Sequence, residues 1–400
     1  MEVFQGNEDT VQSHERVWSL QSALLIAIQE NDIEAAEDVL RQQDLIDPDV
    51  CFGRSPLHGS TGTPAICLCV ERGLYCMTKL LISYGCSVNA CDDNGYTALH
   101  FSCCHQFSDI VRLLVSNRAN VNAVSNFGQT PLHLACQQSS LEIVECLVSH
   151  GADLEKRDAD RKTPLIVSCI CNQTHIVNFL LRSGSDVNAL DSCLNSPLLH
   201  AVNTGLSLNP DLIRILLEAG ADPNHVNHLG NSAIFSVVRR SSEHDLNGFL
   251  SLDSLIEYGV DLNQKHDETA LHLSISRGQD ALTEKLIRSG SDVNERNERG
   301  FSPLHRLARE EKADLVKLMV AAGARVSLPK NFYIDESGIR RDIQNPEIKS
   351  ILAANTGRAP SLKHLSRISI RKWLERKADR VIKQLLLPHS LKEYLLLLDV

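Results

Sequence analysis

Apolar residues recur in short blocks with helical spacing along the first 330 residues, and the blocks themselves repeat. TPLH at 130–133 has counterparts in TALH at 97–100, TPLI at 163–166, SPLL at 196–199, TALH at 269–272 and SPLH at 302–305. SALL at 22–25, SPLH at 55–58 and SAIF at 232–235 extend the series. Most neighbouring tetrads are 33 residues apart. A fixed period of this length predicts nine copies of one structural unit.

The chemistry of each block predicts the same local structure. A Ser or Thr hydroxyl caps a helix, proline suits the first helical position, and leucine begins an apolar face. LEIVECLV at 141–148 predicts a second helix, which Gly151 can end in a left-handed conformation. Asp/Asn-rich turns such as GADL and GSDVNA follow these glycines. One helix pair with its connector cannot bury its own apolar faces, so the units must stack.

These tetrads and their 33-residue period resemble the ankyrin repeat. The resemblance covers residues 20–328 and implies an all-α fold, an ankyrin-repeat solenoid of helix-turn-helix units with hairpin connectors. Residues 1–19 form a separate N-terminal segment. NPEIKSIL at 345–352 lies in the register of a second helix, so residues 329–359 are interpreted as a degenerate capping repeat and linker.

Three intervals exceed the period. Nine extra residues lie between Ser55 and Thr97, three between Ser196 and Ser232, and four between Ser232 and Thr269. Insertions in repeat proteins map to loops, which are often near binding surfaces. Drift at a tolerant surface explains them equally well.

The histidines and cysteines have a structural explanation. His100, His133, His272 and His305 all occupy the fourth tetrad position, where we expect hydrogen bonds to the tetrad Ser/Thr and the neighbouring loop. Cys103, Cys136 and Cys169 are 33 residues apart at a small, buried helix position. The connector carboxylates Asp153, Asp186, Asp222, Asp261 and Asp292 are interpreted as turn residues. No C-x-x-C, P-loop or G-x-S-x-G motif supports a metal site, a cofactor or an enzyme.

Composition narrows the class of partner and the compartment. The formal net charge of −10 argues against nucleic acid, and no apolar run is long enough for a membrane span. Thirteen cysteines without a signal peptide predict reduced thiols in a cytoplasmic protein, with the nucleus as a second location. Residues 360–400 carry nine Lys/Arg against four Asp/Glu, which indicates a separate C-terminal module.

That module begins with SLKHLSRISI at 361–370, where Leu362, Ser366 and Ile370 are spaced by four on one helical stripe. Two more apolar runs follow in VIKQLLLPHSLKEYLLLL, separated by Pro388. Three short helices bury little by themselves and need a partner. The order of motifs resembles a SOCS box, and the whole chain is similar to the ankyrin repeat and SOCS box family.

The resemblance implies a function and its residues. The elongin-binding residues would be Leu362, Leu365, Ser366 and Ile370, and the cullin-binding residues would be Leu387, Pro388, Leu391 and Tyr394. Such a protein is the substrate-recognition subunit of a cullin-5 RING ubiquitin ligase. Its box binds elongin B and elongin C and cullin-5 with its RING subunit, and its repeats bind a substrate protein, here unidentified. The protein itself catalyses nothing.

Two positions depart from the family pattern. Ser366 stands where the elongin motif has cysteine, and Ser390 replaces the second proline of Leu-Pro-x-Pro in the cullin motif. The alternative function is a non-catalytic scaffold that binds elongins or other partners without assembling a ligase. A further alternative treats the C-terminal segment as a helical cap on the repeats or a basic patch for acidic surfaces.

Overall fold

The computed structural model describes residues 8–42, 49–52, 62–205, 207–264, 267–326, 332–334, 340–342 and 345–355. They form two compact units, one up to Ser192 and one from Cys193. The elements of unit 1 are α1 (Glu8–Glu30), α2 (Ile33–Leu40), β1 (Cys51–Phe52), β2 (Thr63–Pro64), α3 (Ala65–Glu71), α4 (Tyr75–Ser83), α5 (Ala98–Cys104), α6 (Ser108–Ser116), α7 (Pro131–Gln137), α8 (Leu141–Ser149), α9 (Pro164–Ile170) and α10 (Thr174–Arg182).

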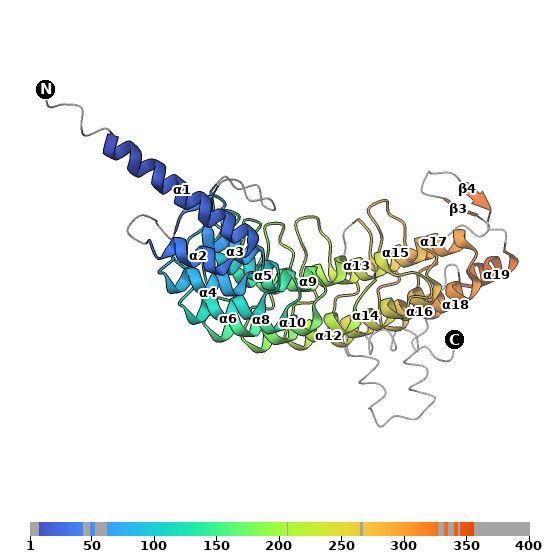
Figure 1. The fold of residues 1–400 in the computed structure, drawn as a ribbon. Coiled ribbons are helices and arrows are strands. Elements are labelled where there is room, and N and C mark those ends of the chain that lie inside the picture. Colours follow the sequence, from blue (N-terminus) through green and yellow to red (C-terminus); the bar gives the residue numbers. More distant parts are fainter. Residues whose placement is uncertain are drawn as a thin grey trace. The chain divides into compact units, whose positions relative to one another are not determined.

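Unit 2 continues the same alternation of short helices (Figure 1). Its elements are α11 (Pro197–Asn203), α12 (Pro210–Glu218), α13 (Ala233–Arg240), α14 (Leu246–Glu257), α15 (Ala270–Ser276), α16 (Asp280–Arg288), α17 (Pro303–Glu310), α18 (Ala313–Ala321), β3 (Phe332–Ile334), β4 (Arg340–Asp342) and α19 (Pro346–Asn355). The expected all-α ankyrin-repeat fold is confirmed, because the only strands in the described ranges form two antiparallel two-stranded hairpins.

The helix boundaries follow the predicted capping chemistry. The tetrad Ser/Thr is the N-cap residue in seven repeats, at Thr97, Thr130, Thr163, Ser196, Ser232, Thr269 and Ser302. After α8, Gly151 adopts φ 84°, and the six equivalent glycines also have positive φ. Glycine suits this position because it has no Cβ, and it therefore adopts the left-handed conformation that ends a helix without a steric clash.

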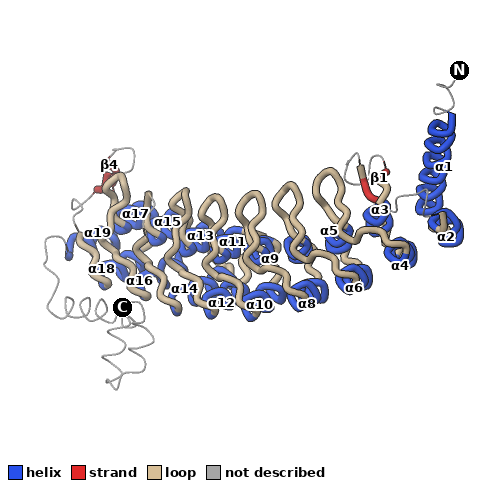
Figure 2. Tube along the Cα trace, turned by 90° about the vertical axis from the view of Figure 1, so that its left-hand side faces the viewer, coloured by secondary structure: helices blue, strands red, loops and turns tan. Residues whose placement is uncertain are grey.

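Within each unit the first helices of the repeats form one row and the second helices form another (Figures 1 and 2). In unit 1, α5 packs on α7 and α7 on α9, while α6 packs on α8. The leucines of the tetrads, Leu99, Leu132 and Leu165, are at most 1% exposed. A repeated core of this kind makes each unit depend on contacts between neighbouring repeats.

The first expected helix start is wrong. Ser22 lies inside α1, which begins at Glu8. No breaker separates Glu8 from Ser22 in the sequence, so the helix runs through the tetrad. The second expected start, Ser55, lies outside the described residues, and the next described helix, α3, begins at Ala65 after Thr63 and Pro64.

The later insertions have definite places in unit 2. The extra residues between Ser196 and Ser232 lie in the turn between α11 and α12, as expected. Those after Ser232 lie only partly in a loop: they lengthen the turn before α14 and α14 itself, which has 12 residues whereas α12 has 9. α19 confirms the helix expected at 345–352, and Asn345 Oδ1 caps it by accepting from the Glu347 N–H at 2.9 Å. Strand β3 packs on α17, while α19 packs on α18.

Other expectations stay predictions. The domain bounds at residues 19, 328 and 359 are untested, and the whole C-terminal module lies outside the described residues. Among the residues that are described, no helix is both long and apolar enough to cross a membrane.

Gly128 and Gly151 offer a matched test of the connectors. A Cβ on Gly128 would lie 2.8 Å from the backbone N of Ala159, whereas one on Gly151 would meet nothing within 4 Å. Both residues have positive φ. We expect Gly151→Ala to lower the free energy of unfolding by about 1 kcal/mol through backbone strain alone. Gly128→Ala should cost roughly 3 kcal/mol, because the clash adds to the strain. Equal losses in urea unfolding of the two variants would contradict the predicted contact.

Candidate functional site: the open positions of the repeats

In three of the described tetrads a buried histidine ties the helix cap to the next repeat. In unit 1, the Thr97 N–H donates to Nδ1 of His100 at 3.1 Å, and the threonine hydroxyl lies 3.0 Å from the same nitrogen. On the other side of the ring, Nε2 lies 3.1 Å from the carbonyl oxygen of Gln129, one repeat further on. Because Nδ1 accepts from a backbone N–H, the ring is neutral and donates to the carbonyl through Nε2.

The same arrangement recurs where the tetrad carries histidine. Nε2 of His133 lies 3.0 Å from the Lys162 carbonyl oxygen, and Nε2 of His272 lies 3.0 Å from that of Phe301. Burial lowers the pKa of His100 to about 4 and lowers the pKa values of His133, His272 and His305. The expected bonds to the tetrad Ser/Thr and to the neighbouring loop are confirmed for His100, His133 and His272, and His305 makes the expected bond to Ser302.

The connectors project as hairpin-like loops beside the first helices, and we call each one a finger (Figure 2). In unit 1, Asp158 Oδ1 closes a finger turn by accepting from the N–H groups of Asp160 and Lys162, at 2.9 and 2.8 Å. The Ala159 N–H then donates to the Phe127 carbonyl of the preceding finger at 2.9 Å. These bonds fix one finger against the next, so the tips are built by the backbone and by turn residues.

The connector carboxylates behave as predicted. Asp153 Oδ1 accepts from the Glu155 N–H at 2.9 Å, and Asp186, Asp222, Asp261 and Asp292 make the equivalent bond two residues on. The Asp153 N–H also donates to Asn122 Oδ1 of the preceding connector at 2.7 Å. No group of three or more His, Cys, Asp or Glu side chains in the described ranges could hold a metal ion.

The repeated cysteines also have the expected place. Cys103, Cys136 and Cys169 are fully buried in first helices, and burial raises their pKa values well above the usual range. All thirteen cysteines are reduced. A protonated, buried thiol behaves as a small apolar residue.

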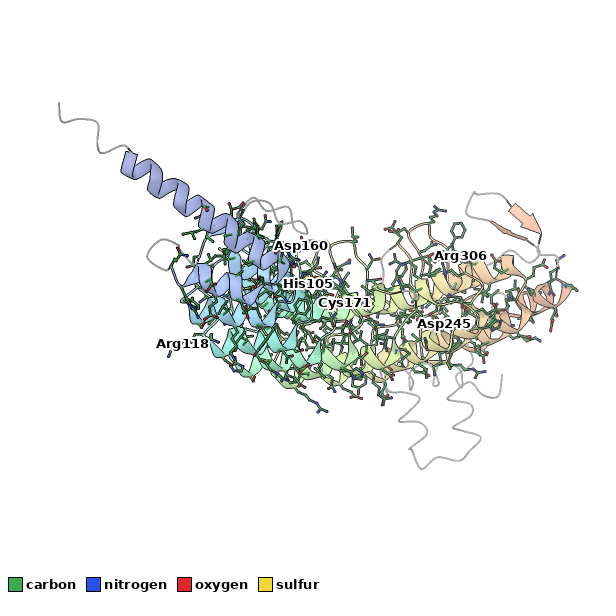
Figure 3. The ribbon with its side chains drawn as sticks, viewed as in Figure 1. His105, Arg118, Asp160, Cys171, Asp245 and Arg306 are labelled. Carbon is green, nitrogen blue, oxygen red and sulfur yellow. The ribbon has the colours of Figure 1, made fainter. Side chains whose placement is uncertain are left out.

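Two positions at the end of each first helix are not specified by the repeat pattern, and we call them the open positions. They are the eighth and ninth residues of the repeats that begin at Thr97 and later tetrads, counted from the tetrad Ser/Thr. In unit 1 they are Cys104 and His105, Gln137 and Gln138, and Ile170 and Cys171. In unit 2 they are Asn203 and Thr204, Arg239 and Arg240, Ser276 and Arg277, and Arg309 and Glu310. Gln137, Arg239, Ser276, Arg277 and Glu310 are exposed, and the other described side chains of the set are half-buried. His105 and Cys171 are labelled in Figure 3, with Asp160 in a neighbouring finger.

Apolar side chains are exposed on two fingers. Phe127 is 53% exposed and Val124 51% exposed in unit 1, and Leu229 is 71% exposed in unit 2. Such side chains beside uncharged open positions suit contact with a protein surface. The sequence signal was present, because an aromatic or leucine stands between turn residues in SNFG and NHLG.

Comparison with protein families agrees with this architecture. The model "Ankyrin repeats (3 copies)" matches residues 24–125, 66–158, 117–191, 155–227 and 240–330, and the model "SOCS box" matches residues 358–396. The chain belongs to the ankyrin repeat and SOCS box family.

Curated relatives of this ankyrin repeat and SOCS box protein share part of its length. Mouse Ankyrin repeat and SOCS box protein 5 is 28% identical over 36% of this chain and 44% of its own length. Mouse Ankyrin repeat and SOCS box protein 9 is 33% identical over 36% of this chain and 49% of its own length. Mouse B-cell lymphoma 3 protein homolog is 35% identical over 30% and 27%. The chain therefore spans less than half the length of each of these relatives.

The sequence-predicted site residues of this ankyrin repeat and SOCS box protein are not brought together by the described part of the structure. The predicted elongin-binding set is Leu362, Leu365, Ser366 and Ile370, and the predicted cullin-binding set is Leu387, Pro388, Leu391 and Tyr394; all eight lie outside the described residues. The open positions were missed from sequence, although counting along the 33-residue register would have found them.

The histidine links predict acid sensitivity. The folded state holds His100 with a pKa of about 4, below the ordinary value of 6.5. Protons therefore bind the unfolded chain more tightly, and stability is fully present above pH 6.5 and is lost as pH falls towards 4. For His100 alone the loss at pH 5 is about 2 kcal/mol. We therefore expect the urea concentration at the unfolding midpoint to decrease when the pH is lowered from 7.5 to 5.

The control is a histidine outside the links. The double variant His100→Gln/His133→Gln should flatten the pH dependence of the urea midpoint, whereas His175→Gln should not, because His175 is exposed. An unchanged pH dependence in the double variant would show that the buried rings do not cause the effect.

Proposed function

We propose that the chain is the substrate-recognition subunit of a cullin-5 RING ubiquitin ligase. The observation that carries the proposal is the SOCS box match at residues 358–396, directly after the ankyrin repeats. The two relatives named for both modules support the same role. The open positions and exposed finger residues provide a surface for a target protein.

The mechanism is proximity. The repeats hold the target, and the SOCS box binds elongin B, elongin C and cullin-5 with its RING subunit. A lysine of the target is then held near the charged ubiquitin-conjugating enzyme, which converts an encounter between two molecules into a reaction within one assembly. The chain supplies no catalytic group in this scheme. Its reduced cysteines fit a cytoplasmic or nuclear location.

We assign elongin contact to the stripe of Leu362, Leu365, Ser366 and Ile370. An apolar helical stripe binds by entering a groove of the partner, with leucine as the anchor. The Ser366 hydroxyl can bond back to the Leu362 carbonyl, which limits the cost of placing a polar group there. The cullin contact is assigned to Leu387, Pro388, Leu391 and Tyr394.

Ser390 favours a second candidate function. It removes the second proline of the cullin motif, and with it a fixed backbone conformation after Pro388. The chain would then be a scaffold that binds elongins and a target without recruiting cullin-5. Cullin-5 co-precipitation in the presence of bound elongin C distinguishes the two functions.

Leu362→Asp tests the elongin contact. A carboxylate in an apolar groove is strongly unfavourable, so elongin C should no longer co-purify with the full chain. Lys363→Gln is the matched control, because residue 363 lies off the stripe of 362, 366 and 370. If elongin C still co-purifies with Leu362→Asp, this helix is not the elongin-binding element.

Restoring the family residue at either of the two departing positions should strengthen binding to the corresponding partner. Ser366→Cys should strengthen elongin C binding by about 1 kcal/mol, since it removes a hydroxyl from an apolar contact. Ser390→Pro should increase cullin-5 recovery without changing elongin C recovery. Isothermal titration with purified elongin B/C and quantitative co-precipitation measure the two effects. If Ser366→Cys binds elongin C more weakly than wild type, the serine does not reduce the free energy of elongin binding.

A further inference from the structure

The charge of the open positions differs between the two units. In unit 1 the six residues are Cys104, His105, Gln137, Gln138, Ile170 and Cys171, with no Lys, Arg, Asp or Glu among them. In unit 2 they include Arg239, Arg240, Arg277 and Arg309, with Glu310 as the one carboxylate. The same helix ends therefore form with and without arginine. A cation near a helix C-terminus gains a little from the helix dipole, but the fold of unit 1 does not need it.

Arg239, Arg240 and Arg277 are held differently. Arg240 is part-buried, and its Nη1 and Nη2 donate to the carbonyl oxygens of Asn203 and Gly205 at 2.9 and 2.6 Å. Arg239 is exposed, and its Nη2 reaches only the Asn203 side-chain oxygen at 3.4 Å. Within the described residues neither has a carboxylate at ion-pair distance. Arg240 acts as a structural link, while the Arg239 guanidinium is available to a ligand.

Arg277 lies on the neighbouring repeat, at the end of α15. The turn that follows it packs against the end of α13, because Gln279 Nε2 donates to the carbonyl oxygens of Val238, at 3.1 Å, and Ser241. Arg277 is exposed, and in the described part of unit 2 no hydrogen bond or ion pair occupies its guanidinium. Two exposed cations thus stand at the ends of adjacent first helices.

Other charges in this region are already paired. Arg306, labelled in Figure 3, binds Glu268 at 2.6 Å, and the two side chains are 17% and 20% exposed. Lys312 pairs with Asp280, and Glu243 lies close enough to raise the pKa of Lys312. Arg239 and Arg277, at the ends of α13 and α15, are therefore exposed cations that have neither a carboxylate nor, unlike Arg240, bonds to backbone carbonyls among the described residues.

We propose that Arg239 and Arg277 bind carboxylate side chains of an acidic peptide segment in the target protein. This inference rests on the proposed function and adds the chemical class of the target segment. Arginine matches a carboxylate with two parallel hydrogen bonds, and two arginines on adjacent repeats select two acidic residues in one extended segment.

The test uses the full chain and a fluorescein-labelled octaglutamate, with octaglutamine and a phosphoserine octapeptide as comparison probes. Fluorescence anisotropy should show octaglutamate binding that weakens with salt and no octaglutamine binding. Arg239→Gln/Arg277→Gln, which copies the uncharged glutamines of unit 1, should weaken octaglutamate binding at least about tenfold.

The control Arg214→Gln/Arg288→Gln removes the same charge from α12 and α16, where each arginine pairs with a glutamate. It should change octaglutamate affinity by less than about twofold. Equal losses in both double variants, an unaffected Arg239→Gln/Arg277→Gln, or no octaglutamate binding by wild type would each overturn the proposal. Binding of the phosphoserine peptide without octaglutamate binding would overturn the choice of carboxylate.

Elongin C recovery from the same preparations separates this inference from the proposed function. Wild type and Arg239→Gln/Arg277→Gln should both retain elongin C, and equal urea midpoints of the two proteins show that the variant repeats are folded. Loss of elongin C from wild type would defeat the ligase function whatever octaglutamate does. Retained elongin C with unchanged octaglutamate binding in the variant would defeat the acidic-segment inference alone.

Discussion

Where the tetrad ends in histidine, contact between neighbouring repeats depends on the buried ring. The ring accepts from the backbone N–H of its own helix cap and lies within hydrogen-bond distance of a carbonyl of the following finger, as His100 does between Thr97 and Gln129. Each link therefore satisfies two backbone groups that would otherwise be buried without partners. It works only with a neutral ring, and burial keeps the ring neutral. Local capping and contact between repeats are thus one interaction.

This framework leaves the surface chemistry free. Turn residues such as Asp158 bond to backbone groups, and the fingers bond to one another through backbone atoms such as Ala159 N. Neither kind of bond involves the open positions, and equivalent helix ends carry glutamine, isoleucine or arginine, although Arg240 also links its repeat to the preceding one. Variation at a site that the fold does not constrain is the property a target-binding surface needs.

The sequence predicts much of the fold because capping, apolar spacing and turn chemistry agree in most repeats. It failed where they disagreed. TPAICLCV at 63–70 lacks the tetrad leucine, yet its apolar residues form α3, all seven residues of which are buried. At Ser22 the tetrad is present, but preceding helix formers continue the helix through it. A tetrad therefore marks a helix start only where no helix already runs, and a buried apolar face can form a helix without the full tetrad.

The two candidate binding surfaces, the SOCS box and the open positions, also differ in how far the sequence predicts them. Motif order was enough to predict the SOCS box, because a short helix with one apolar stripe has few uses besides a partner's groove. The open positions gave no such motif, since what matters there is exposure and the absence of an ion-pair partner. Arg239 and Arg306 look alike in sequence, yet only Arg306 has a carboxylate, Glu268, held by the fold. Packing between neighbouring repeats decides which arginine remains free for a target, and the sequence pattern alone does not predict that packing.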